Sequence, residues 1–127
     1  MPLPRWMRTA LLATAAMNVA AVGVFLPVGD PLRAWLGLPG EAHPLYLATI
    51  ALFVGLFGLG YLWAALSDRA ERVFIRMAAV GKLSFVALLV GFWSAGAIPV
   101  RAPVAAAGDL VFGVLFLVWL VQSRATR

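Results

Sequence analysis

Four apolar segments, each close to the length that a helix needs to cross a bilayer, dominate this chain. They cover about residues 9–28, 45–66, 73–98 and 104–121. Each is too long and too continuously apolar for a strand, and none alternates as a membrane barrel does. Proline, glycine and charged residues mark the breaks between them. The pattern predicts an all-α integral membrane protein, with residues 1–127 forming a single up-down bundle of four transmembrane helices.

The composition supports this prediction and excludes several classes of protein. Hydrophobic residues make up 64% of the chain and charged residues 12%, and a globule of 127 residues has too little interior to hide so much apolar surface. There is no cysteine, which excludes disulfides and thiolate metal sites. The net charge of +5 does not indicate nucleic-acid binding, because the arginines flank the apolar segments without interleaved aromatic residues.

The basic residues predict the orientation, because cytoplasmic loops carry an excess of Lys and Arg. One side of the membrane would hold Arg5, Arg8, Arg69, Arg72, Arg76, Arg124 and Arg127, and the other Arg33 and Arg101. Two aromatic belts agree: Trp6, Tyr61, Trp63 and Trp119 near the inner boundary, and Trp35, Tyr46 and Trp93 near the outer one. We therefore expect a multi-pass protein with both termini in the cytoplasm.

Small residues recur at helical spacing in the first two segments. They are Ala13, Ala16, Ala20 and Gly23 in the first, and Ala48, Ala51, Gly55 and Gly58 in the second. In lipid, small residues let helices approach closely, which apolar surface alone does not achieve. The two stripes predict tight packing of the first hairpin. They suit a homodimer equally well, so a homo-oligomer or a partner membrane protein stays open.

The first outer loop has two interpretations. Its segment Pro31–Pro39 predicts either a short amphipathic helix at the headgroups or a loop kinked by proline and glycine. In the helical interpretation, Leu32, Trp35 and Leu36 would face lipid.

Lys82 places a charge inside the third apolar segment, about 9–14 Å from its cytoplasmic start at about 1.5 Å per residue. Ionisable side chains inside a membrane are unfavourable and are candidate functional groups. Three interpretations remain: the lysine stem snorkels towards the headgroups, the ammonium makes a structural bond between helices, or it contacts a ligand or a transported species.

Asp109 lies near the outer start of the last segment, where a helix dipole favours negative charge. If the hairpin turns at Pro99–Pro103, Asp109 stands opposite residues 90–93, about 10–15 Å along the axis from Lys82. A direct salt bridge is then not expected, and a water-bridged or ligand-bridged arrangement fits better.

Tyr61 and Asn18 are the other candidates. Folding the second and third segments about the SDRAER turn sets Lys82 near Tyr61, whose hydroxyl can accept a hydrogen bond from the ammonium. Asn18 lies near mid-membrane in the first segment, where its amide needs a partner. An intramembrane asparagine acts either as a bond between helices or as part of a ligand site.

The residues needed for catalysis or for holding a cofactor are missing from the pattern. There is no phosphate loop, no nucleophile beside a base and no histidine within an apolar segment. His43 stands alone in an outer loop, without the neighbours that a metal site needs. We therefore expect no enzymatic activity, no cofactor and no metal.

Several short motifs resemble those of small bacterial four-span proteins that are DoxX-like in the broad sense. They are MNVAAVGVFLP from Met17, GLFGLGYLWAALSD from Gly55, VGKL from Val80 and GDLVF from Gly108. The resemblance implies a location in the bacterial inner membrane and gives Asn18, Tyr61, Asp68, Lys82 and Asp109 as positions of interest. DoxX-like proteins are loosely tied to quinone or respiratory accessory roles, and the resemblance carries over no activity.

Two functions of different kinds fit these observations. The first is an accessory or scaffold protein in contact with membrane lipid, whose polar residues only fix helix packing. The second is a binder or carrier of a small amphipathic molecule, a lipid or a quinone, with Lys82 as the charged contact. A small transporter or channel is a third, weaker prediction. A carrier predicts a polar or water-lined cavity that reaches Lys82, and a scaffold predicts a filled core.

Overall fold

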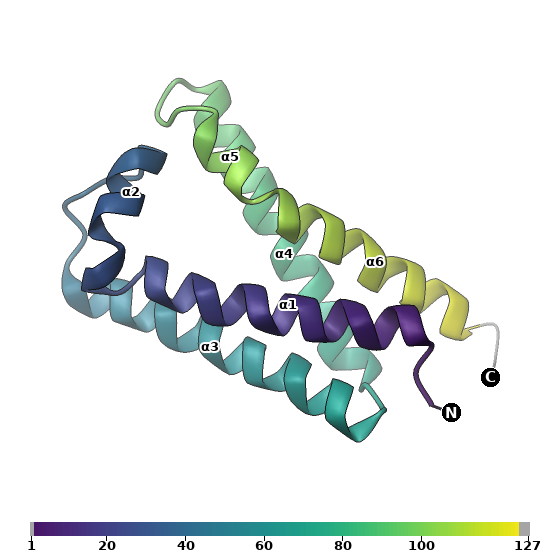
Figure 1. The fold of residues 1–127 in the computed structure, drawn as a ribbon. Coiled ribbons are helices and arrows are strands. Elements are labelled where there is room, and N and C mark those ends of the chain that lie inside the picture. Colours follow the sequence, from purple (N-terminus) through teal and green to yellow (C-terminus); the bar gives the residue numbers. More distant parts are fainter. Residues whose placement is uncertain (1, 125–127) are drawn as a thin grey trace.

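The structure, a computed structural model, describes residues 2–124. Within this range it has four helices that are long and apolar enough to cross a membrane: α1 (Arg5–Val24), α3 (Pro44–Ser67), α4 (Arg72–Ser94) and α6 (Ala107–Arg124). They alternate in direction and pack as a bundle (Figure 1). The predicted all-α bundle of four apolar helices is therefore confirmed.

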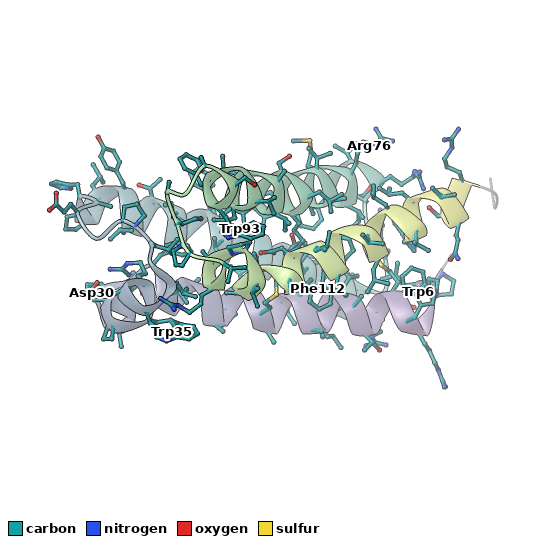
Figure 2. All side chains as sticks on the ribbon, turned by 90° about the horizontal axis from the view of Figure 1, so that it is seen from above. Trp6, Asp30, Trp35, Arg76, Trp93 and Phe112 are labelled. Atoms are coloured by element: carbon teal, nitrogen blue, oxygen red, sulfur yellow. The ribbon has the colours of Figure 1, made fainter. Side chains whose placement is uncertain are left out.

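The bundle has two ends that differ in structure. We call the end where α1 begins and α6 ends the terminal end, and the opposite end the distal end (Figure 1). Trp6 and Arg76 lie towards the terminal end, and Asp30 and Trp35 lie at the distal end (Figure 2).

Two helix boundaries differ from the predicted segments because the chain turns earlier than its hydropathy suggests. α1 ends at Val24, and a short 3-10 turn, η1 (Pro27–Gly29), follows it. α4 ends at Ser94, and Gly96 then takes a left-handed conformation with φ of 79°. Glycine adopts this conformation without the steric penalty that a Cβ atom brings. The apolar residues beyond each turn belong to the connections at the distal end.

Two short helices form these distal connections, α2 (Asp30–Leu36) and α5 (Arg101–Ala105). The first connection is thus helical over Asp30–Leu36, as one of its two interpretations predicted, whereas its location at the headgroups stays a prediction. Leu32 and Trp35 are exposed as predicted, but Leu36 is buried, so the prediction that it faces lipid is wrong. Its side chain is covered because α2 docks onto the bundle instead of lying apart from it.

The docking of α2 depends on Arg101. Its Nε donates to the Trp35 carbonyl oxygen at 2.8 Å, and its guanidinium carbon lies 5.3 Å from the centre of the Trp35 ring. Gly37, at the end of α2, lies so close to Pro99 that a Cβ atom there would be 2.3 Å from the proline ring. These contacts join the two distal connections.

Within the bundle, α1 packs most closely with α3, and α4 with α6. In the first pair, Gly58 leaves room for α1: a Cβ atom at Gly58 would lie 3.1 Å from the Asn18 Cβ. Ala51 is buried and Gly55 approaches Val22, so these three residues take part in packing as predicted.

The other small residues do not pack between these two helices. Ala48 is exposed, and so are Ala13, Ala16 and Ala20 of α1, while Gly23 is half-buried with open space where a Cβ atom would lie. Their alternative role in a homodimer stays a prediction. The face of α1 that meets the bundle carries Met7, Ala10, Leu11, Thr14, Ala15 and Asn18, which include both small and large residues. Asn18 lies against Gly58, where the glycine leaves room for it.

Within residues 2–124, the larger of two core clusters lies towards the terminal end, and a smaller one, Leu89, Ile98, Ala102 and Ala106, lies towards the distal end. The buried residues of the larger cluster are Met7, Leu11, Ala15, Tyr61, Ala64, Ala65, Ile75, Ala78, Ala79, Phe116, Trp119 and Leu120. Tyr61 and Trp119 are thus part of the interior, which contradicts their assignment to an aromatic belt. Trp63, on the other face of α3, is exposed. Sequence position along the axis could place these rings at a depth but could not say which way they face.

We predict that Gly58→Leu destabilises the bundle by about 2 kcal/mol or more, because the added side chain would push α1 away from α3. Ala48→Leu, on the exposed face of the same helix, should change the free energy of unfolding by less than about 0.5 kcal/mol. Unfolding by SDS titration in mild detergent measures both. Equal destabilisation by the two variants would contradict the packing described here.

Candidate functional site

A cavity of about 390 Å³ lies between the α1–α3 pair and the α4–α6 pair. All four candidate residues, Asn18, Tyr61, Lys82 and Asp109, line it. The other lining residues are apolar and come from α1, α3, α4 and the two short distal helices, whereas α6 contributes Asp109 alone. The structure therefore brings residues from four long helices to one site.

Lys82 and Asp109 form a direct salt bridge in this cavity. The Lys82 Nζ lies 2.9 Å from the Asp109 Oδ1, and the two side chains are 6% and 21% exposed. Lys82 stands about 15 Å along the α4 axis from Arg72, at about 1.5 Å per residue. The prediction that the two groups are too far apart for a direct contact is wrong, and the ammonium is paired instead of snorkelled.

The error has a clear cause in the position of the turn. The expectation assumed that the chain reverses at Pro99–Pro103, but that segment largely forms α5. The reversal follows directly on the end of α4, at the left-handed Gly96. Lys82 and Asp109 lie at nearly equal numbers of residues from Gly96, so the two helices bring them to the same depth.

Asp109 is held at the beginning of a helix. The chain is interrupted at Ala106, between α5 and α6, and Asp109 lies in the first turn of α6. The partial positive charge of a helix N-terminus favours a carboxylate at this position. The predicted helix-start location is confirmed, and the interruption places it beside Lys82 rather than at the outer boundary.

Tyr61 forms one wall of the site with its ring. The Lys82 Nζ lies 5.3 Å from the ring centre, within the range of a cation–π interaction. The predicted contact was with the hydroxyl, whereas the contact that the structure shows is with the ring. Phe74 and Phe116 pack against Tyr61 at 5.5 Å and 5.6 Å between ring centres, which fixes its position.

Asn18 bonds two helices together. Its Nδ2 donates to the Val54 carbonyl oxygen of α3 at 3.0 Å. This hydrogen bond agrees with the interpretation of Asn18 as a residue that joins two helices. The two interpretations are compatible, because an amide has further donor and acceptor capacity beyond one bond, and Asn18 also lines the cavity.

Two further polar residues that the sequence raised lie away from the cavity lining. Asp68 ends α3 in a left-handed conformation, and its Oδ1 accepts from the backbone N–H of Leu3 at 3.2 Å. The Nδ1 of His43 accepts from the Leu45 N–H and caps α3. Among residues 2–124, no group of three His, Asp or Glu side chains is placed to hold a metal ion.

Sequence reasoning missed the role of Arg33, which it counted only as an outer-side charge. Arg33 is buried and donates to the carbonyl oxygens of Val24 and Leu26 at the end of α1, and it pairs with Asp30. The spacing of Asp30 and Arg33, three residues apart on a helix, was a usable signal for the pair. The burial was not readable, because it depends on how α2 folds back over α1.

It also missed Arg72, which joins α4 to α6 at the terminal end. The Arg72 Nη2 donates to the Leu120 carbonyl oxygen at 3.0 Å, and the guanidinium carbon lies 5.8 Å from the centre of the Trp119 ring. Together with the Lys82–Asp109 pair, this contact fixes the α4–α6 register at two depths.

Comparison with known proteins adds no identification: no family model, curated protein or solved structure matches this chain. The resemblance to DoxX-like proteins therefore rests on the short motifs alone.

We predict that Lys82→Met lowers the free energy of unfolding by about 3 kcal/mol, because it leaves the Asp109 carboxylate without its counter-charge. Lys82→Met combined with Asp109→Leu should recover most of this loss, since an apolar pair leaves no buried charge. Arg76→Met, an exposed position on the same helix, should change stability by less than about 0.5 kcal/mol. SDS titration in bilayers or mild detergent measures all three. Unchanged stability in Lys82→Met would mean that the ammonium snorkels.

Proposed function

We propose that this protein binds a small amphipathic molecule, a lipid or a quinone, in the cavity between its two helix pairs. The Lys82–Asp109 pair is the polar contact for the headgroup, and the apolar lining receives the hydrocarbon. The observation that carries the proposal is the cavity itself, which reaches Lys82 at a depth where a scaffold would have a filled core.

The size and chemistry of the cavity support this proposal. Small-molecule sites in proteins span about 300–1,000 Å³, and the volume here is about 390 Å³. Such sites are mostly apolar, with a few convergent polar groups that orient the ligand. Here the convergent groups are Asn18, Tyr61, Lys82 and Asp109, and every other lining residue is apolar.

A scaffold or accessory role is the second candidate. It is favoured by the pairing of Lys82 with Asp109 and by the Asn18 bond to α3, because both interactions stabilise the bundle without a ligand. In this case the cavity would hold only disordered lipid chains.

For the location, we propose the bacterial inner membrane, with the terminal end in the cytoplasm. The excess of arginine at that end supports the orientation. The DoxX-like motifs support the choice of membrane and are consistent with a quinone as one ligand of the proposed class.

The test of binding uses two glycines of α4 that have open space where a Cβ atom would lie, Gly81 and Gly91. Gly81 lines the cavity and Gly91 does not. We expect the wild-type protein, purified from membranes in mild detergent, to carry a small amphipathic molecule detectable by native mass spectrometry. Gly81→Leu, which fills part of the cavity, should lose it, while Gly91→Leu should retain it.

Two outcomes would contradict the proposal. One is that the wild-type protein carries no bound molecule even after incubation with a total lipid extract, which would favour the scaffold role. The other is that wild type, Gly81→Leu and Gly91→Leu all carry the same lipids in the same amounts, which would show that the lipids bind to the outer surface of the bundle.

A further inference from the structure

We infer that the cavity selects an uncharged headgroup on a single hydrocarbon chain, and that this molecule enters sideways from the bilayer between α3 and α4. The inference rests on the proposed function and narrows it to a class of ligand and a route. Three features of the site carry it: its balance of charge, the distribution of its exposed residues and its volume.

The charges inside the cavity already compensate each other. Lys82 and Asp109 are the ionisable lining residues apart from the Tyr61 phenol, and they lie 2.9 Å apart. A ligand with a net charge would add an unpaired charge to a poorly solvated space or would have to break the existing pair, and both are strongly unfavourable. An uncharged headgroup avoids this penalty.

The pair still offers hydrogen bonds to such a headgroup. An ammonium has three donors, of which one points to the Asp109 Oδ1, and a carboxylate accepts at two oxygens. The Asp109 side chain is 21% exposed, which leaves part of it accessible from the cavity. A headgroup with a carbonyl or hydroxyl oxygen can therefore bind both members of the pair without separating them.

The opening of the cavity lies between α3 and α4. Its large exposed lining residues all come from these two helices: Ile50, Phe53, Phe57, Met77 and Phe85. In contrast to α1 with α3 and α4 with α6, these two helices do not pack closely along their length. A side that is exposed and apolar faces lipid in a membrane protein, so the opening leads into the hydrocarbon.

Both ends of the opening are bounded. Towards the terminal end, Phe74 of α4 stacks on Phe57 of α3 with 5.6 Å between ring centres and packs against Tyr61. Towards the distal end, Leu36 and Leu38 line the cavity, and α2 is held there by Arg101. The remaining route is lateral.

The volume favours a ligand with one chain. The cavity volume of about 390 Å³ lies near the lower end of the range for small-molecule sites, about 300–1,000 Å³. This space holds a compact headgroup and the first carbons of one chain, and the rest of the chain would extend between α3 and α4 into the bilayer. A second chain would have to lie outside the cavity along its whole length, so a single-chain ligand fits this space better.

The experiment uses photoreactive amphiphiles that carry a diazirine near the end of the chain, added to wild-type protein in phosphatidylcholine nanodiscs. Four probes share one chain: a monoacylglycerol, a benzoquinone derivative, a fatty acid and an alkyltrimethylammonium. A fifth, a diacylglycerol, has two chains. Cross-linked residues are mapped by mass spectrometry, with Gly81→Leu as the cavity-filled variant and Gly91→Leu as its matched control.

We expect the two uncharged single-chain probes to cross-link to residues of α3 and α4 around Phe53 and Phe85, and Gly81→Leu to abolish this labelling while Gly91→Leu retains it. The charged and two-chain probes should label these positions at most about one tenth as strongly as the uncharged single-chain probes. A tenfold difference in binding corresponds to about 1.4 kcal/mol. Labelling by only one of the uncharged probes would distinguish an acylglycerol from a quinone within the class.

The results that overturn the inference differ from those that overturn the proposed function. Strong, Gly81-dependent labelling by the fatty acid or the ammonium probe would disprove selection for an uncharged headgroup while preserving a binding function. Gly81-dependent labelling confined to α1 or α6 would disprove the lateral route. If Gly81→Leu changes the labelling by none of the probes, the cavity is not a binding site, and the proposed function itself is contradicted.

Discussion

The salt bridge between Lys82 and Asp109 is the interaction on which the rest of this bundle depends. In a hydrocarbon environment neither charge is tolerated alone, so the pair strongly favours the one register of α4 and α6 that brings the groups together. The turn at Gly96, the short helix α5 and the interruption at Ala106 all adjust the chain to that register. The contact of Arg72 with the end of α6 holds the same register at the terminal end. Two polar contacts, one buried in the apolar segments and one at the terminal end, thereby align the α4–α6 hairpin.

The two helix pairs meet in different ways at the two ends. At the terminal end the rings of Tyr61, Phe74 and Phe116 fill the space between the pairs and form the core. Beyond Lys82 the pairs separate, and the cavity occupies the gap beneath the distal helices α2 and α5. The site is therefore bounded by aromatic rings towards the terminal end and by the short connecting helices α2 and α5 towards the distal end. The larger core cluster thus lies at one end, and the cavity lies between it and the distal connections.

Much of the fold was readable from sequence, because bilayer thickness dictates the length of apolar segments and charged or helix-breaking residues mark their ends. The four candidate site residues were readable for the same reason, since polar groups stand out in apolar helices. The pairing of Lys82 with Asp109 was not readable, because it depends on where the chain turns, and PVRAP resembles a turn more than the less conspicuous Gly96 does.

The packing face of α1 was also missed. Small residues show where helices can approach, but the contacting face is decided by the partner, and here Asn18 lies against Gly58 of α3. The burial of Arg33 depended on α2 folding back, which no local pattern indicated.

The separation of α3 from α4 makes the surrounding membrane part of the wall of this protein. Along that side, Phe53, Met77 and Phe85 present apolar surface that is completed by whichever acyl chains lie against it. The thickness, chain order and unsaturation of the bilayer then act on the shape of the cavity directly, without an allosteric site or a second domain. If the cavity binds a ligand as proposed, its occupancy would depend on the physical state of the membrane, and in detergent it would depend on the detergent chain as well as on the sequence.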